Sequence, residues 1–247
     1  MTAPQGSLPL LGDPAFLRVL NHADDNLVLA QRLGEWISRA PELEEDIALG
    51  NIALDHLGVA RALLTHAGRL EGAGRDEDDL AMGRPERGFT NILLVEQPNG
   101  DFAMTMARQF LFDTYQLELW ERLSHDQDEV LAGIAEKAHK EARYHFRHSS
   151  AWLVRLGDGT EESNRRAQAA LDSLWRFTEE MFSIDDSNGL EQGWLRRVTP
   201  IIDAATLIIP ADTHQRSGGR RGLHTEHLGV VVAEMQWMHR AYPEVEW

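Results

Sequence analysis

Residues 128–156, DEVLAGIAEKAHKEARYHFRHSSAWLVRL, decide the fold of this chain. Apolar or small side chains recur here at helical intervals, namely at Ile134, Ala138, Ala142, Ser149, Trp152 and Leu156. This spacing predicts an amphipathic helix with one face in a hydrophobic core. At about 100° per residue, His145 falls near the centre of the buried face and Glu141 falls on its edge.

Most of the remaining sequence is also typical of helices, which we expect at 15–38, 42–70, 101–124, 161–182, 190–208 and 225–241. Between the second and third of these lies a long connection, residues 72–100, which contains prolines and Asn99-Gly100. Two helical hairpins joined by a long crossover are the connectivity of a ferritin-like bundle. The sequence therefore predicts an all-α fold, a ferritin-like four-helix bundle with additional C-terminal helices.

Composition limits the function classes. We expect residues 1–247 to form a single domain, with residues 1–14 as a flexible extension. The formal charge of −16, from 40 acidic and 24 basic residues, argues against nucleic acid or an anionic membrane as partner. The absence of cysteine excludes disulfides and iron–sulfur clusters in this chain. No signal peptide and no membrane span is evident, so we expect a cytoplasmic protein.

Buried carboxylates suggest a metal centre. A di-iron site in this fold takes a Glu from each of two helices and a Glu-x-x-His from each of the other two. Asp113 lies in the middle of an apolar stripe on the helix expected at 101–124, and Asp55 lies on an apolar face of the helix expected at 42–70. Because a buried, unpaired carboxylate is costly, Asp113 must be paired, protonated or coordinated.

The ligand count nevertheless falls short. Gly58 stands three residues after Asp55, where the motif needs a histidine, and His56 is about 100° away around the helix. We therefore expect no catalytic residue and no bound metal, but vestigial di-iron-like positions at Asp55, Asp113, Glu141 and His145. Protonation, His145 or an arginine such as Arg61 or Arg108 would then neutralise the buried carboxylates. The alternative is a catalytic di-iron or di-manganese carboxylate oxidase that uses the same residues.

A second candidate site is the segment RSGGRRGLHTEHLG, residues 216–229. Its arginines are the densest basic cluster of an acidic chain, so they indicate either an anion- or partner-docking loop or a solvated loop that balances nearby acids. Its histidines and glutamate have no established metal-ligand spacing. The docking residues expected here are Arg216, Arg220, Arg221, His224, Glu226 and His227.

Six tracts carry a family resemblance: LVLAQRLGEW (27–36), LLVEQPNGDFA (93–103), EARYH (141–145), LWRFTEE (174–180), GLHTEHLG (222–229) and AEMQW (233–237). Together they resemble the C subunits of bacterial phenylacetyl-CoA epoxidase. The resemblance extends from about residue 24 to the C-terminus and does not include the first twenty or so residues.

The resemblance implies a multicomponent monooxygenase of aerobic phenylacetate catabolism, which converts the aromatic ring of phenylacetyl-CoA into its 1,2-epoxide. It implies that the di-iron centre lies in the catalytic A subunit, and that a reductase with FAD and an iron–sulfur cluster supplies electrons from NADPH. The C subunit is then a structural, ferritin-like paralogue without a cofactor of its own. Its expected partners are the A subunit and the other subunits of the complex, with a homodimer when it is alone.

Overall fold

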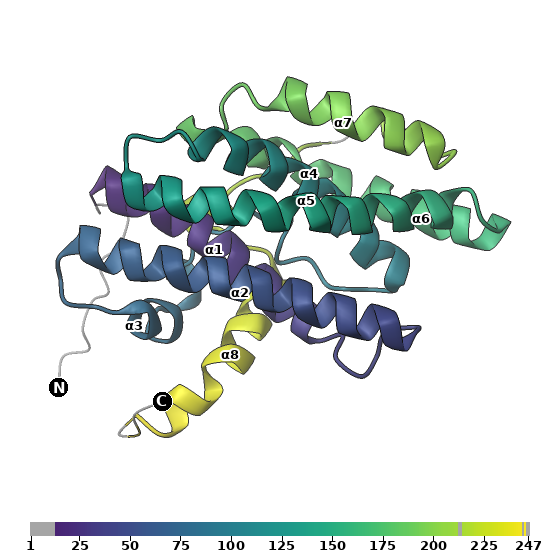
Figure 1. Ribbon diagram of the computed structural model, residues 1–247. Helices are drawn as coiled ribbons and strands as arrows, with labels where there is room; N and C mark the ends of the chain where they lie inside the picture. The colour runs from purple at the N-terminus through teal and green to yellow at the C-terminus, as the bar shows by residue number, and fades with distance from the viewer. Residues whose placement is uncertain (1–12, 212–213, 244, 246–247) are drawn as a thin grey trace.

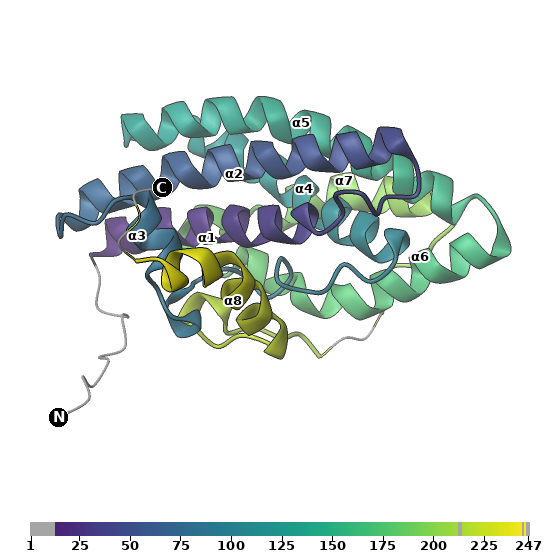
Figure 2. The ribbon, with the colours of Figure 1, turned by 90° about the horizontal axis from the view of Figure 1, so that it is seen from below.

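The computed structural model describes residues 13–211, 214–243 and 245. Within these residues it contains eight α-helices and no β-strand. The bundle is built from α1 (Pro14–Gly34), α2 (Leu43–Glu71), α4 (Phe102–Leu123) and α5 (Glu129–Gly157), which run alongside one another (Figures 1 and 2). Helix α1 packs against α2, α4 packs against α5, and α2 contacts α5. The predicted all-α, ferritin-like fold with additional helices is confirmed.

The remaining helices cover the outside of the bundle. Helices α6 (Glu161–Leu174) and α7 (Glu191–Ala204) pack on α4 and α5. Helix α8 (Glu226–Ala241) lies on the side of the molecule opposite α7 and runs at an angle to the bundle helices (Figure 1). It contacts α1 and the short α3 (Glu77–Met82). Helix α3 also packs against α2, but the outer side of α2 around Leu54 and Leu57 stays exposed.

Local capping explains where the bundle helices begin and end. The side chains of Asp13, Asp101 and Asp128 accept hydrogen bonds from backbone N–H groups in the first turns of α1, α4 and α5. Aspartate at this position satisfies donors that the helix itself leaves free. Helix α2 ends at Gly72, whose φ of 67° is the left-handed conformation that favours glycine.

Several boundaries differ from the predicted ones. The helix predicted at 161–182 ends at Leu174 and continues as short 3-10 turns. In the last of these turns Glu180 is buried and accepts hydrogen bonds from the backbone N–H groups of Leu93, Gly218 and Gly219 at 2.8, 2.6 and 2.8 Å. These contacts join the segment after α6 to the crossover and to the C-terminal loop.

The other differences are smaller. The helices predicted at 15–38 and 190–208 end at Gly34 and Ala204, each shortly before a residue with positive φ, Ser38 at 67° and Thr206 at 55°. The connection predicted at 72–100 contains α3, which a reciprocal capping box between Asp76 and Asp79 stabilises. Of the predicted N-terminal extension, residues 1–12 lie outside the described part of the chain.

Buried charge pairs fix the crossover connection to α1. Asp24 pairs with Arg84 and accepts hydrogen bonds from the backbone and side chain of Thr90. Its neighbour Asp25 accepts from the backbone N–H of Ile92 at 2.8 Å and pairs with Arg220 through both carboxylate oxygens, at 2.9 and 2.7 Å. Both aspartates are buried, so each must keep its partner.

Helix α2 carries an apolar stripe on its uncovered side. Leu43, Ile47, Leu54 and Leu57 are 71%, 56%, 65% and 40% exposed, and their spacing of four, seven and three residues places them on one face. These four residues are called the α2 stripe below. Helix α2 is also the one described helix that is long and apolar enough to cross a membrane, although its inner face packs in the bundle.

The Arg220–Asp25 pair gives a first prediction. Replacing Arg220 with alanine leaves Asp25 buried without its counter-charge, so we expect the free energy of unfolding to fall by about 3–5 kcal/mol. Arg221 is exposed on the same turn, and Arg221→Ala should change stability by less than about 0.5 kcal/mol. Urea unfolding of both variants measures the difference. Equal stability of the two variants would contradict the assigned role of the buried pair.

Candidate functional site

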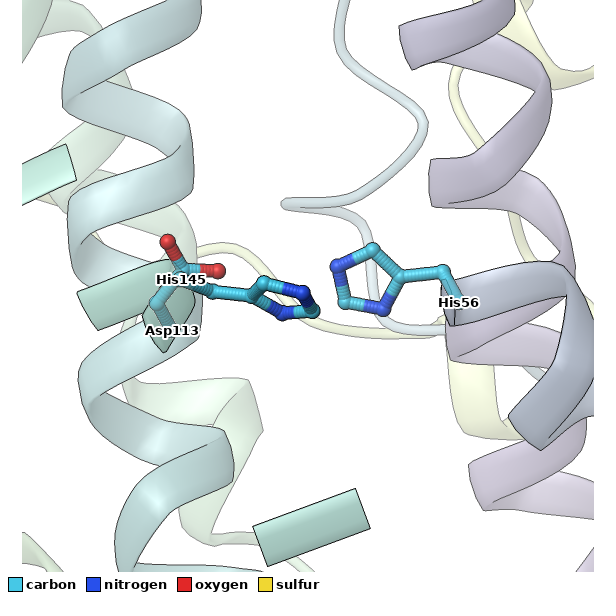
Figure 3. A group of neighbouring side chains, drawn as sticks. All are labelled: His56, Asp113 and His145. Atoms are coloured by element: carbon cyan, nitrogen blue, oxygen red, sulfur yellow. The ribbon is translucent and has the colours of Figure 1, made fainter. Parts of the chain in front are cut away.

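Three polar side chains meet at the centre of the bundle: His56 from α2, Asp113 from α4 and His145 from α5 (Figure 3). All three are buried, and one potential metal-ligand atom from each lies within 4.8 Å of the others. The two imidazoles face each other across the bundle, with ring centroids 5.0 Å apart. This cluster is called the central triad below.

The contacts of His56 define which of its nitrogens carries hydrogen. Its Nδ1 lies 2.8 Å from Oδ1 of Asn26, whose amide nitrogen donates to the backbone oxygen of His22 at 2.8 Å. Because Oδ1 can only accept, Nδ1 must be the protonated nitrogen. Nε2 then carries a free lone pair, and it is buried with no hydrogen-bond partner. Burial and the neighbouring His145 lower the pKa of His56 well below its usual value, which keeps the ring neutral.

Asp113 is the least satisfied carboxylate of the bundle. It is buried, and neither of its oxygens has a hydrogen-bond partner among the described residues. Burial raises the pKa of Asp113 to about 6, against the opposing effects of His145 and the Ser149 hydroxyl. That hydroxyl is not a free donor, because it donates to the backbone oxygen of His145 at 3.1 Å. Asp113 is thus a carboxylate without a committed partner.

The arginines expected to neutralise Asp113 do not reach it. Arg61 is exposed and pairs with Glu77. Arg108 is buried but donates to the backbone oxygen of Gln97 at 2.6 Å. Of the three expected ways to neutralise Asp113, a direct arginine partner is absent among the described residues, because both guanidinium groups are held by other acceptors; protonation and His145 remain.

Asp55 and Glu141 lie outside the triad. Asp55 is at the seam between α2 and α5, where its Oδ2 is 3.0 Å from Nε2 of His145 and its side chain is 38% exposed. Glu141 lies 3.5 Å from Lys137, and burial raises the pKa of Glu141 despite that cation. Of the four positions expected from the sequence, the structure therefore gathers Asp113, His145 and Asp55, with Asp55 on the outer side of the His145 ring, and leaves Glu141 at the edge.

The inward face of α2 corrects the interpretation of the ligand motif. His56, which the count from Asp55 placed off the metal-facing side, points into the bundle, whereas Gly58 is exposed. The histidine of α2 is thus present. What is missing is the glutamate three residues earlier, where Ala53 stands, and α5 repeats the pattern with Ala142 before His145.

A dinuclear centre does not fit these residues. The fold's di-iron site uses two Glu-x-x-His motifs and two further glutamates, which is six side chains. Among the described residues, the group close enough to share an ion contains two histidines and one aspartate, and Asn26 on α1 is bonded to His56 instead of presenting a carboxylate. The interior therefore lacks the carboxylates that a pair of iron ions needs.

The loop at 216–229 divides into internal and exposed residues. Arg220 is committed to its buried pair with Asp25. His224 uses both ring nitrogens, Nδ1 towards Glu96 at 2.8 Å and Nε2 towards the backbone oxygen of Phe89 at 2.9 Å. Both partners are acceptors, so His224 is doubly protonated and has no lone pair for a metal. Arg220 and His224 therefore stabilise the fold, and His224 also forms part of the wall of an open hollow.

The other loop residues face outward. Arg216, Arg221 and Glu226 are exposed, and His227 is half-buried. Arg216, Glu226 and His227 line an open hollow of about 730 Å³, which Phe177 also lines. This hollow is the part of the loop that remains accessible to a partner or an anion.

The sequence matches known proteins over nearly its whole length. A family model described as phenylacetic acid catabolic protein matches residues 12–247. The chain is also 49% identical, over 241 residues, to the C subunit of 1,2-phenylacetyl-CoA epoxidase from Escherichia coli (strain K12). That alignment covers 92% of this chain and 97% of the relative. The match thus extends over the bundle and the added helices alike.

The His224–Glu96 pair predicts a pH dependence of stability. Burial alone would lower the pKa of His224, but the hydrogen bond and charge of Glu96 outweigh it and raise the pKa. A folded-state pKa above the unfolded value means that the pair stabilises fully below about pH 6.5 and loses this contribution as pH rises through the folded-state pKa.

Urea unfolding of the wild type and His224→Gln across pH 5.5–8.5, a range chosen to span about pH 6.5, tests this. At the acidic end we expect the substitution to lower the free energy of unfolding by about 1–3 kcal/mol. The difference between the two proteins should shrink as pH rises. Other groups that titrate in both proteins cancel in this comparison. A difference that grows with pH would contradict the assigned protonation state.

Proposed function

The chain belongs to the phenylacetic acid catabolic protein family, and from this premise we propose that it is a non-catalytic, structural subunit of a multicomponent di-iron monooxygenase. The proposed complex epoxidises the aromatic ring of phenylacetyl-CoA in aerobic phenylacetate catabolism. The relative from Escherichia coli, which is a subunit of 1,2-phenylacetyl-CoA epoxidase, supports the reaction and the presence of further subunits.

One observation supports the non-catalytic role most directly. In both inward-facing Glu-x-x-His motifs the glutamate is replaced by alanine, Ala53 before His56 and Ala142 before His145. Without these carboxylates the bundle cannot hold two iron ions in the manner of the di-iron fold. The alternative, a catalytic di-iron or di-manganese oxidase, needs Asp55 and Glu141 as ligands. Both lie at the edge of the bundle with other partners, His145 and Lys137.

In the proposed complex, oxygen activation, thioester binding and electron supply belong to different subunits. The catalytic A subunit holds the di-iron centre and the CoA thioester, and a reductase supplies electrons from NADPH through FAD and an iron–sulfur cluster. This chain binds the A subunit, and the complex is cytoplasmic. The net charge of −16 supports this division, because an acidic surface repels the phosphates of CoA.

The α2 stripe is the surface that we assign to the A subunit. Four exposed aliphatic side chains on one bundle helix form the kind of apolar patch that marks a protein interface. Gly50 and Gly58 lie on the same helix and have nothing within 4 Å of where a Cβ would stand, so a partner helix can approach the backbone closely. The A subunit is the expected occupant, because the relative is itself one subunit of an assembly.

The accessible part of the loop provides a second, polar contact in this proposal. Arg216, Arg221, Glu226 and His227 remain available to a partner, whereas Arg220 and His224 are internal. The loop therefore contributes charge at the rim of an interface, where electrostatic attraction mainly accelerates association.

The stripe is tested by Ile47→Glu combined with Leu54→Glu. Two charges in the centre of an apolar interface should weaken binding to the A subunit by about 2 kcal/mol or more and reduce epoxidation by the reconstituted complex. Ile208→Glu is the matched control, because Ile208 is also apolar and is 73% exposed outside the stripe. Circular dichroism checks that all the variants fold.

Either of two results would contradict the assigned surface. Unchanged complex formation by the double variant would show that the A subunit binds elsewhere. Flotation of the wild-type chain, but not of the double variant, with lipid vesicles would show that the stripe binds a membrane instead.

The loop is tested by Arg216→Ala combined with Arg221→Ala. We expect slower association with the A subunit at low salt and a loss of up to about 1 kcal/mol of affinity per arginine, since both groups are exposed. Surface plasmon resonance at two salt concentrations measures this. An association rate equal to that of the wild type at both concentrations would show that the loop is a solvated connector.

A further inference from the structure

The central triad is an electrostatic anomaly that the structural role does not explain. Elsewhere in the described interior, the buried carboxylates Asp24, Asp25, Glu96 and Glu180 all accept hydrogen bonds from protein donors. Asp113 accepts none, and Nε2 of His56 faces the same space with a free lone pair. The centre of the bundle thus gathers acceptors and leaves them without a donor.

Both imidazoles have the outer partner that a metal-bound histidine requires. Nδ1 of His56 donates to Asn26, and Nε2 of His145 lies 3.0 Å from the carboxylate of Asp55. A histidine that binds a metal through one nitrogen almost always donates its other N–H to a carboxylate or a carbonyl oxygen, which fixes the ring. Asn26 and Asp55 occupy these positions for the two rings.

We propose that His56, Asp113 and His145 bind one divalent transition-metal ion through Nε2 of His56, a carboxylate oxygen of Asp113 and the Nδ1 nitrogen of His145. Two imidazoles and one carboxylate are a ligand set that zinc, iron and other first-row dications accept. Ligand atoms around such an ion are separated by about 3–4 Å. The ligand atoms of the triad lie within 4.8 Å of one another, so binding an ion requires them to approach by about 1 Å.

Charge balance supports a single ion. Asp113 and the outer Asp55 together carry the two negative charges that neutralise a dication, while the histidines remain neutral. A second ion would need the carboxylates that Ala53 and Ala142 do not provide. The site is thus independent of oxygen activation by two irons, and its metal would stabilise the bundle.

The test uses the full chain without a histidine tag. After removal of metals with a chelator, the protein is loaded with Co²⁺, and loosely bound ions are removed. Plasma mass spectrometry should then find about one Co²⁺ per chain, and the visible spectrum should show ligand-field bands of nitrogen and oxygen coordination. Both signals should disappear in His56→Gln and in Asp113→Asn. Asp55→Asn, which alters the outer partner of His145, should weaken binding about 10- to 100-fold.

Matched controls are available on the same two helices. His66 on α2 lies 2.6 Å from Asp128, and His148 on α5 lies 2.8 Å from Glu45, so both form histidine–carboxylate pairs outside the triad. His66→Gln should keep the ion, and so should His148→Gln, although the charge of His148 lowers the pKa of Asp113. Co²⁺ should raise the melting temperature of the wild type and of these controls, but not that of Asp113→Asn.

The melting curves also show whether the Asp113→Asn variant is folded. In chelator, Asp113→Asn should melt at or above the wild-type temperature, because the substitution removes an unpaired buried carboxylate. Retention of no ion by the wild type, or of equal amounts by wild type and Asp113→Asn, would overturn the mononuclear site and leave the structural role intact. Two ions per chain would overturn both the mononuclear site and the non-catalytic role.

Discussion

The paired aspartates of α1 are the constraint on which the rest of the structure depends. Asp24 binds the crossover connection through Arg84 and Thr90, and Asp25 binds the C-terminal loop through Arg220. Two adjacent carboxylates in an apolar interior are tolerated only because each has a bidentate arginine. The crossover enters α4, so this anchoring also sets the position of α4 in the bundle. The fold is therefore held by a few specific charges in addition to the apolar core.

The carboxylate at the centre of the bundle, Asp113, differs from the paired carboxylates of the crossover. Along the crossover, the carboxylate of Glu96 accepts from Asn91, from Thr225 and from the charged ring of His224, so its charge is fully compensated. Asp113 is equally buried and has no such donors. Other buried polar atoms of the described chain also lack a partner, but Asp113 is the carboxylate with neither oxygen bonded, and native interiors rarely leave such a group unpaired. The carboxylates that hold the fold together therefore have hydrogen-bond donors, whereas the carboxylate of the candidate site has none.

Helical periodicity was sufficient to predict the fold class, the four bundle helices and the burial of Asp113 and His145, within about four residues at each boundary. It was insufficient for His56, because a helix that is apolar almost all round has no clear inward direction in its sequence. The spacing was counted from Asp55, whereas the inward face is set by contacts with α1 that involve Asn26. Similarly, nothing local distinguishes Arg220 from its neighbours in the loop. Only the position of Asp25, 195 residues away, makes that arginine internal.

The two proposed roles of α2 are physically connected. Its outer face carries the stripe assigned to the A subunit, its inner face carries His56, and Asp55 stands between them with 38% of its side chain exposed. A partner that covers the stripe and extends to the seam between α2 and α5 would remove water from Asp55. The lower local dielectric strengthens the contact between that carboxylate and His145. In the proposed assembly, the stripe and the triad would therefore be linked through Asp55, the one residue of α2 that contacts His145 and remains partly open to solvent.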